Sequence, residues 1–167
     1  MKVDPYGAAY AWAREQYGAT LRDDGLRVMD HAAHVAENVV AFGRRDVEMV
    51  AAALLHDVLE TTATPAAEIE RRFGPQVARL VVALTNAPGE PTAVSAQRAL
   101  QAGEDALFLR LCDRLAGLRH AAGRPPASRE KFLQATREVY LPLVEQHFPA
   151  LAAEMTAVLQ EAERSPL

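Results

Sequence analysis

The stretch Ala51-Ala-Ala-Leu-Leu-His56-Asp57-Val-Leu-Glu60-Thr61 is an apolar run with an imidazole and two carboxylates near its end. Alanine and leucine favour helix, so the run predicts a buried helix. Positions three and four apart share one face of a helix, which places Glu60 beside both His56 and Asp57. These side chains offer a nitrogen and an oxygen ligand for a divalent metal and a nearby carboxylate for acid or base chemistry. The alternative is that a lone His-Asp pair is exposed at a helix end, as unpaired polar residues usually are.

Two other segments favour the metal interpretation. His31 lies near the start of an amphipathic run over residues 30–40, and Asp113 interrupts an apolar run over residues 106–118. A buried carboxylate without a partner is strongly disfavoured, so Asp113 must be paired or must bind a metal. The residues predicted to form a metal site are therefore His31, His56, Asp57 and Asp113.

The order and spacing of these residues resemble the HD-domain metal-dependent phosphohydrolases. The resemblance is closest to the hydrolase domain of the RelA/SpoT family, which degrades guanosine tetraphosphate (ppGpp). Residues 51–60 are similar to that family's AALLHDxxED segment, residues 68–81 to its EIxxxFGxxVAxLV segment, and residues 111–119 to its LADRLHNLR segment. Because no synthetase domain follows, the chain resembles the stand-alone small hydrolases of the family.

The resemblance implies a Mn²⁺ ion and a reaction in which water attacks the 3′-diphosphate of ppGpp and releases pyrophosphate. It favours His31 over His34 as a metal ligand, which leaves His34 a supporting role beside the site. Glu60 would orient or deprotonate the water, with Thr61 as the second catalytic position. The implied metal ligands are His31, His56, Asp57 and Asp113. The implied substrate-binding residues are Arg22, Arg98, Arg114, His120 and Tyr140.

Three arginines have expected roles in substrate binding. Arg22 would stack on or pair with the guanine end of the nucleotide, although its position also suits an ordinary exposed loop arginine. Arg22, together with Arg98 and Arg114, would also supply positive charge to the phosphates. The segment Ala87-Pro-Gly-Glu-Pro91 is the clearest loop in the chain and is expected near the mouth of the site.

Several positions differ from the family's pattern and leave the substrate open. The family has Glu-Asp where this chain has Glu60-Thr61, and a threonine hydroxyl cannot act as a base near neutral pH. Gly117 and His120 replace an Asn and a Thr that line the family's nucleotide pocket, and His120 could meet a phosphate or another base instead. Two alternatives stay open: hydrolysis of another nucleotide, for example at the 2′-phosphate of NADPH, and a non-catalytic nucleotide-binding module.

The composition predicts an all-α fold. The chain is rich in alanine and leucine, and its 167 residues are enough for one domain with a real core. We expect a single compact helical domain of the HD type over residues 1–167, with its motifs between about residues 22 and 143. Pro142 should kink or restart its helix. The expected helices cover residues 4–17, 28–42, 46–59, 65–86, 92–102, 104–123, 128–148 and 150–162.

Charge and hydropathy limit the classes of partner that we expect. Half of the residues are apolar, but no run approaches the length of a membrane span and the first residues lack a signal-peptide pattern. We therefore expect a soluble, cytoplasmic protein without a membrane partner. A net charge of −4 offers no polyanion-binding surface, so the expected partner is a small phosphorylated nucleotide and not a nucleic acid. The single Cys112 excludes an internal disulfide, and the oligomeric state is left open.

Overall fold

The structure is a computed structural model and describes residues 4–165. Its elements are α1 (Pro5–Tyr17), α2 (Val28–Ala41), α3 (Val47–Leu55), α4 (Val58–Thr61), α5 (Ala66–Phe73), α6 (Pro75–Leu84), α7 (Thr92–Ala102), α8 (Glu104–Arg119), η1 (Ala121–Gly123), α9 (Pro126–Ala135), η2 (Thr136–Tyr140), α10 (Leu141–His147) and α11 (Pro149–Arg164). Within residues 4–165 the only extended pairing is an isolated bridge between Leu21 and Arg27. The predicted all-α fold class is thus confirmed.

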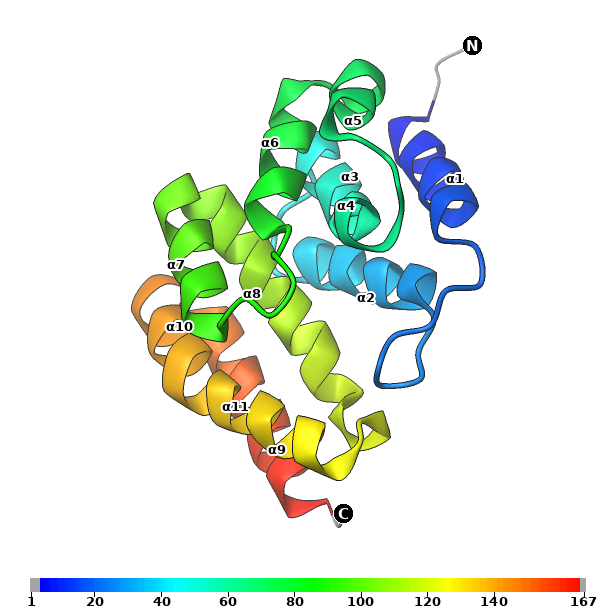
Figure 1. The fold of residues 1–167 in the computed structure, drawn as a ribbon. Helices are drawn as coiled ribbons and strands as arrows, with labels where there is room; N and C mark the ends of the chain where they lie inside the picture. The colour runs from blue at the N-terminus through cyan, green and yellow to red at the C-terminus, as the bar shows by residue number, and fades with distance from the viewer. Residues whose placement is uncertain (1–3, 166–167) are drawn as a thin grey trace.

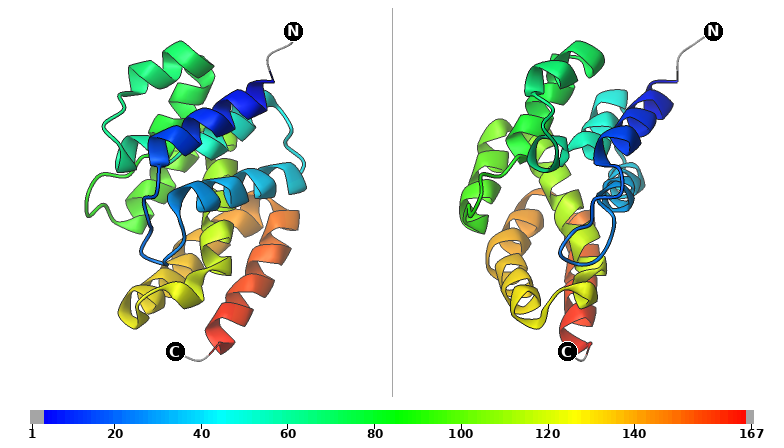
Figure 2. Two further views of the ribbon diagram at one scale, coloured as in Figure 1. Left: turned by 90° about the vertical axis from the view of Figure 1, so that its right-hand side faces the viewer. Right: turned by 45° about the vertical axis from the view of Figure 1, so that its right-hand side comes forward.

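Helix α8 lies at the centre of the fold and is buried along most of its length (Figure 1). It packs against α2 and α3, which precede it in the chain, and against α7 and α11. Helices α1 to α6 gather at one end of the molecule and α9 to α11 at the other (Figure 2). One cluster of buried apolar side chains extends from Ala9 in α1 to Leu159 in α11, so the two ends share a core.

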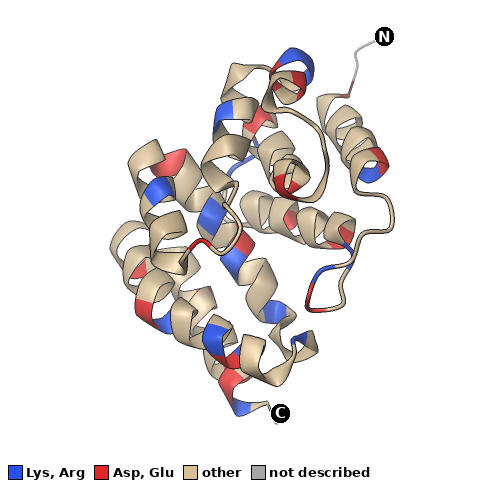
Figure 3. Ribbon diagram, in the orientation of Figure 1, with Lys and Arg blue, Asp and Glu red and all other residues tan. Residues whose placement is uncertain are grey.

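Charges are spread over the surface of this bundle. In the view of Figure 3, basic and acidic residues are interspersed over the molecule, and the face shown carries no continuous basic stripe. Among the described residues, no helix combines the length and the apolar character needed to cross a membrane.

The expected helix over residues 46–59 is wrong in one respect: α3 ends at Leu55 and α4 begins at Val58. The cause is a change of hydrogen-bond partners. The carbonyl of Ala53 accepts a bond from the His56 side chain at 2.7 Å, and the amide of Asp57 donates to the Tyr17 hydroxyl at 3.3 Å. Because these bonds replace the regular ladder, His56 and Asp57 lie in a turn.

The expected helix over residues 65–86 is also divided, into α5 and α6, by Gly74. Gly74 has a φ of 90°, a conformation that ends α5, and Pro75 then occupies the first turn of α6, where its missing N–H costs nothing. Near the other end of the chain, the π-helical turn η2 directly precedes Pro142, which cannot donate a bond to the preceding turn. The expected interruption at Pro142 is therefore confirmed.

Candidate metal centre and adjoining cavity

The turn between α3 and α4 fixes the orientation of the His56 ring. Its Nδ1 atom lies 2.7 Å from the Ala53 carbonyl and donates to it, so in the neutral ring the free lone pair is on Nε2. His56 is only 1% exposed, and its Nε2 has no hydrogen-bond partner within residues 4–165. Buried polar atoms are nearly always paired, so this nitrogen is suited to bind a metal ion.

Two residues from other helices, Asp113 and His31, lie near this nitrogen. Asp113 Oδ1 lies 3.5 Å from His56 Nε2 and 2.8 Å from Nε2 of the fully buried His31. One ligand atom from each of these three residues falls within 4.8 Å of the others. Asp57 Oδ2 approaches His56 Nε2 to 3.4 Å. The structure therefore brings together the predicted residues from α2, α8 and the turn between α3 and α4 as a possible metal site.

The electrostatics of the site favour a cation. Burial opposes protonation of His56, but the carboxylates of Asp57 and Asp113 raise the pKa of His56 to about 9. Burial also opposes ionisation of Asp113, yet His56 and the hydrogen bond with His31 hold the pKa of the Asp113 carboxyl well below its usual range. A site that stabilises an imidazolium in this way would also stabilise a metal cation in its place.

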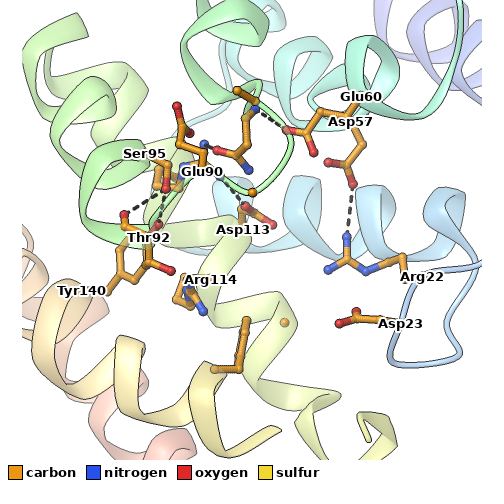
Figure 4. Close-up of a pocket in the computed structure, with 16 residues that line it drawn as sticks. Arg22, Asp23, Asp57, Glu60, Glu90, Thr92, Ser95, Asp113, Arg114 and Tyr140 are labelled. Carbon is orange, nitrogen blue, oxygen red and sulfur yellow. Dashed lines mark hydrogen bonds and ion pairs between the residues drawn. The ribbon is translucent and has the colours of Figure 1, made fainter. Parts of the chain in front are cut away.

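A cavity of about 400 Å³ adjoins the site. Figure 4 shows Asp57, Glu60 and Asp113 directed toward this space, with Arg22 at one side and Arg114 and Tyr140 at the other. Its lining residues are Arg22, Asp23, Asp57, Glu60, Asn86, Ala87, Gly89, Glu90, Thr92, Ser95, Arg110, Asp113, Arg114, Gly117, Phe132 and Tyr140. As expected, the loop over residues 87–91 contributes to its wall.

Glu60 and Thr61 have different surroundings although they are adjacent. Glu60 lines the cavity, where burial and the nearby charge of Asp57 raise the pKa of its carboxyl. Thr61 does not line the cavity, and its hydroxyl donates to the carbonyl of Asp57 at 2.8 Å. Glu60 therefore faces the cavity, whereas the Thr61 side chain bonds the backbone one turn earlier.

Arg22 reaches the metal site from the loop between α1 and α2. Its Nη1 atom donates to Asp57 Oδ2 at 3.2 Å, and its Nε atom lies 3.4 Å from Asp24 Oδ2. The side chain is 18% exposed, so Arg22 is neither fully buried nor an ordinary solvent-exposed loop residue. It closes one side of the cavity and pairs with a carboxylate of the predicted metal set.

Aromatic rings form the wall opposite Arg22. The guanidinium carbon of Arg114 lies 4.1 Å from the centroid of the Phe132 ring and 4.2 Å from that of Tyr140, so Arg114 is stacked between the two rings. Gly117 leaves space for this arrangement, because a Cβ atom there would lie 2.9 Å from Phe132 Cζ. Phe132 was not among the predicted site residues, since a phenylalanine in an amphipathic helix is indistinguishable from a core residue by sequence.

Two predicted substrate-binding residues lie outside the cavity. Arg98 donates to the Ala83 carbonyl at 3.1 Å and forms an ion pair with Glu90. His120 stacks on His34, with ring centroids 5.0 Å apart and the planes 5° from parallel. The cavity as formed thus gives no support to direct substrate contacts by Arg98 and His120.

Six polar lining residues were not among the predicted site residues: Asp23, Asn86, Glu90, Thr92, Ser95 and Arg110. Arg110 is buried, and its Nη1 atom donates to Asp113 Oδ2 at 3.2 Å. Its position one turn before Asp113 in an apolar helix was an available signal, because a buried cation needs an acidic partner. Asn86 at the end of α6 carried no comparable signal.

Comparisons with known proteins identify the family of this chain. The HD domain family model matches residues 9–147. The chain is 34% identical over 142 residues to a guanosine-3′,5′-bis(diphosphate) 3′-pyrophosphohydrolase of Aquifex aeolicus, and 29% identical over 145 residues to the bifunctional (p)ppGpp synthase/hydrolase SpoT of Escherichia coli. Each match covers 81% of this chain and 20% of the relative, so the chain spans about a fifth of the length of these relatives.

A solved structure has the same fold. It is described as a metazoan ortholog of SpoT that hydrolyses ppGpp, and it superposes with a TM-score of 0.84 at 20% sequence identity, over 96% of this chain and 97% of the other. At that identity the likeness concerns the fold alone. The family model spans most of the chain, and His31, His56, Asp57 and Asp113 converge beside the cavity. The chain therefore belongs to the HD-domain family.

Proposed function

We propose that this chain is a metal-dependent pyrophosphohydrolase that removes the 3′-diphosphate of ppGpp. The observation that carries the proposal is the convergence of His31, His56, Asp57 and Asp113 at one edge of a cavity that also contains Glu60. The names of the Aquifex aeolicus and Escherichia coli relatives support the choice of substrate.

In this proposal the four residues hold a divalent ion, which we infer to be Mn²⁺. The free lone pair of buried His56 Nε2 and the ionised carboxyl of Asp113 fit such an ion. When bound, it would polarise a phosphoryl oxygen and lower the pKa of a coordinated water toward neutrality. The Ala53 carbonyl holds His56 in the tautomer that this role needs.

Glu60 takes the proton of the attacking water in the proposed reaction. Its carboxylate lines the same cavity as Asp57 and Asp113, and the raised pKa of its carboxyl brings proton transfer closer to neutral pH. A positioned general base contributes about 10²- to 10⁴-fold to the rate. Thr61 supplies no second acid, so Glu60 carries this role alone among the two positions.

The nucleotide occupies the cavity between Arg22 and the Arg114–Tyr140 wall. A volume of about 400 Å³ is within the range of small-molecule sites. The planar guanidinium of Arg22 is suited both to stacking on a base and to pairing with phosphate. Arg114, held between two rings, supplies positive charge at the wall opposite Arg22.

One observation favours a second candidate, hydrolysis of a nucleotide with fewer phosphates, such as removal of the 2′-phosphate of NADPH. The cavity is lined by five acidic residues and only three arginines. Two of the arginines, Arg22 and Arg110, are already paired with Asp57 and Asp113. The cavity therefore offers little unpaired positive charge for a substrate with two diphosphates.

Substrate profiling tests both candidates. Purified protein is incubated with Mn²⁺ and ppGpp, and pyrophosphate release is measured beside a chelated control and a panel of nucleotides that includes NADPH. Metal-dependent release of pyrophosphate from ppGpp would support the proposal. Turnover of another nucleotide with none of ppGpp would favour the second candidate, and metal binding without turnover would leave a non-catalytic nucleotide-binding module.

A further inference from the structure

Asn86, at the start of the loop after α6, connects three elements. Its backbone N–H donates to Glu60 Oε1 at 2.5 Å. Its side-chain Oδ1 accepts two bonds of 3.0 Å each, from Nη2 of Arg98 on α7 and from Nη2 of Arg110 on α8. One residue therefore binds the Glu60 carboxylate through its backbone while two guanidinium groups hold its side chain.

Both arginines also form hydrogen bonds with other groups of the protein. Arg110 also donates to the Leu84 carbonyl at 2.6 Å and to Asp113 Oδ2 at 3.2 Å. Arg98 also donates to the Ala83 carbonyl at 3.1 Å and pairs with Glu90 in the loop. Each arginine thus bonds the last turn of α6 and the Asn86 side chain together, and we call Asn86, Arg98 and Arg110 the Asn86 clamp.

The clamp determines where the Glu60 carboxylate lies relative to the metal site. Residue 86 is outside any helix, so its N–H has no position imposed by a helical ladder. Hydrogen bonds from guanidinium groups are charge-assisted and directional, and two of them meet on one oxygen here. Through Arg110 the same clamp is bonded to Asp113, so Glu60 and a predicted metal ligand are placed by one connected network.

We propose that Asn86 is a positioning residue for hydrolysis, which holds the Glu60 carboxylate in its reactive place, and that Arg98 and Arg110 act through it. The inference rests on the proposed function, in which Glu60 takes the proton of the attacking water. It gives Arg98 a role that differs from the phosphate contact expected from the sequence.

A double-mutant cycle separates this role from a merely structural one. Asn86→Ala removes the acceptor of both guanidinium bonds, and misplacement of a reacting group lowers kcat by about 10- to 100-fold. KM should stay within about twofold, because the substrate contacts of the other lining residues remain. Asn86→Asp keeps an acceptor oxygen and should retain most of the wild-type kcat. Gln97→Ala, on the exposed face of α7 beside Arg98, is the control and should turn over like wild type.

The decisive comparison is made in a Glu60→Gln background. If Asn86 acts through Glu60, Asn86→Ala causes no further loss of kcat there, because coupled residues are not additive. An equal loss in both backgrounds, or a wild-type kcat in Asn86→Ala, would overturn the inference.

Crystal structures test the same point without turnover. The Glu60 carboxylate should leave the amide of residue 86 in the Asn86→Ala variant, and an unchanged carboxylate position would refute the clamp. If wild-type protein released no pyrophosphate from ppGpp, the proposed function would fail, and these structures would still decide the inference.

Discussion

Phe132 occupies the space that a side chain at residue 117 would need, with its Cζ atom 2.9 Å from the position of a Cβ on Gly117. Gly117→Ala should therefore displace the Phe132 ring from its stack on Arg114. Overpacking of this kind costs about 1–3 kcal/mol of the free energy of unfolding. Urea denaturation followed by circular dichroism measures it. A second change, Phe132→Leu, should recover part of the loss, whereas a Gly117→Ala protein as stable as wild type would contradict the packing described.

The same pair illustrates what the sequence could not predict. The amphipathic runs and the motif spacing predict most helices and bring His31, His56, Asp57 and Asp113 together, because these depend on local pattern and on order along the chain. Phe132, which fills the space beside Gly117, belongs to another helix. His34, on which His120 stacks, also belongs to another helix. Such directions are decided by tertiary packing, which a single sequence does not display.

The break between α3 and α4 has a similar origin. It depends on the Tyr17 hydroxyl, which accepts a bond from the amide of Asp57 and donates to the Leu54 carbonyl at 2.9 Å. Tyr17 lies 40 residues before Asp57 in the chain. Helix propensity alone therefore predicts an uninterrupted helix through His56, although the residue type itself predicts a metal-binding role for His56.

Metal binding should depend on Asp113 and not on His34. Asp113→Asn removes the charge that His31 and His56 face, and Mn²⁺ affinity measured by calorimetry should be lost or fall by about 10- to 100-fold or more. His34→Ala is the matched control, since His34 stacks on His120 and is separate from the cluster of His31, His56 and Asp113. Loss of Mn²⁺ affinity in the His34 variant alone would show that His34, and not His31, binds the metal.

A bound ion should also stabilise the fold. A ligand that binds only the native state adds about 2.7 kcal/mol to the free energy of unfolding at 100 times its Kd. For a chain of this size, that corresponds to a rise in Tm of roughly 5–10 °C. Thermal unfolding with Mn²⁺ and with a chelator measures the difference, and the Asp113→Asn protein should show a smaller shift or none. An equal shift in that variant would place the ion elsewhere.

Metal affinity should rise with pH. The imidazole of His56 must be neutral to bind an ion, and Asp57 and Asp113 raise the pKa of His56 to about 9 in the metal-free protein. A proton therefore competes with Mn²⁺ below that pH, and the apparent affinity should rise by up to about tenfold per pH unit between neutrality and about 9. Calorimetry at a series of pH values measures the slope, and a flat profile would show that His56 is not a ligand.

The same shift affects the stability of the metal-free protein. Because the pKa of folded His56 is raised above its value in the unfolded chain, protonation of His56 stabilises the fold. That contribution is complete below the unfolded pKa and is lost as the pH rises through about 9. Urea unfolding of chelated protein should therefore give a smaller free energy at pH 9 than at pH 6, and this fall should shrink in His56→Ala.

Glu60 and Thr61 should differ sharply in their effect on turnover. Glu60→Gln keeps the shape of the side chain and removes the base, so kcat should fall by about 10²- to 10⁴-fold with Mn²⁺ affinity unchanged.

Thr61→Val removes a hydroxyl that only bonds the Asp57 carbonyl, outside the lining of the cavity. Its kcat should stay within about threefold of wild type, as for a surface change away from the reacting atoms. A large loss of kcat in Thr61→Val would show that this hydroxyl takes part in the reaction. It could do so by holding the attacking water in place of the acid found in the family. Equal activity in Glu60→Gln and wild type would remove Glu60 as the base.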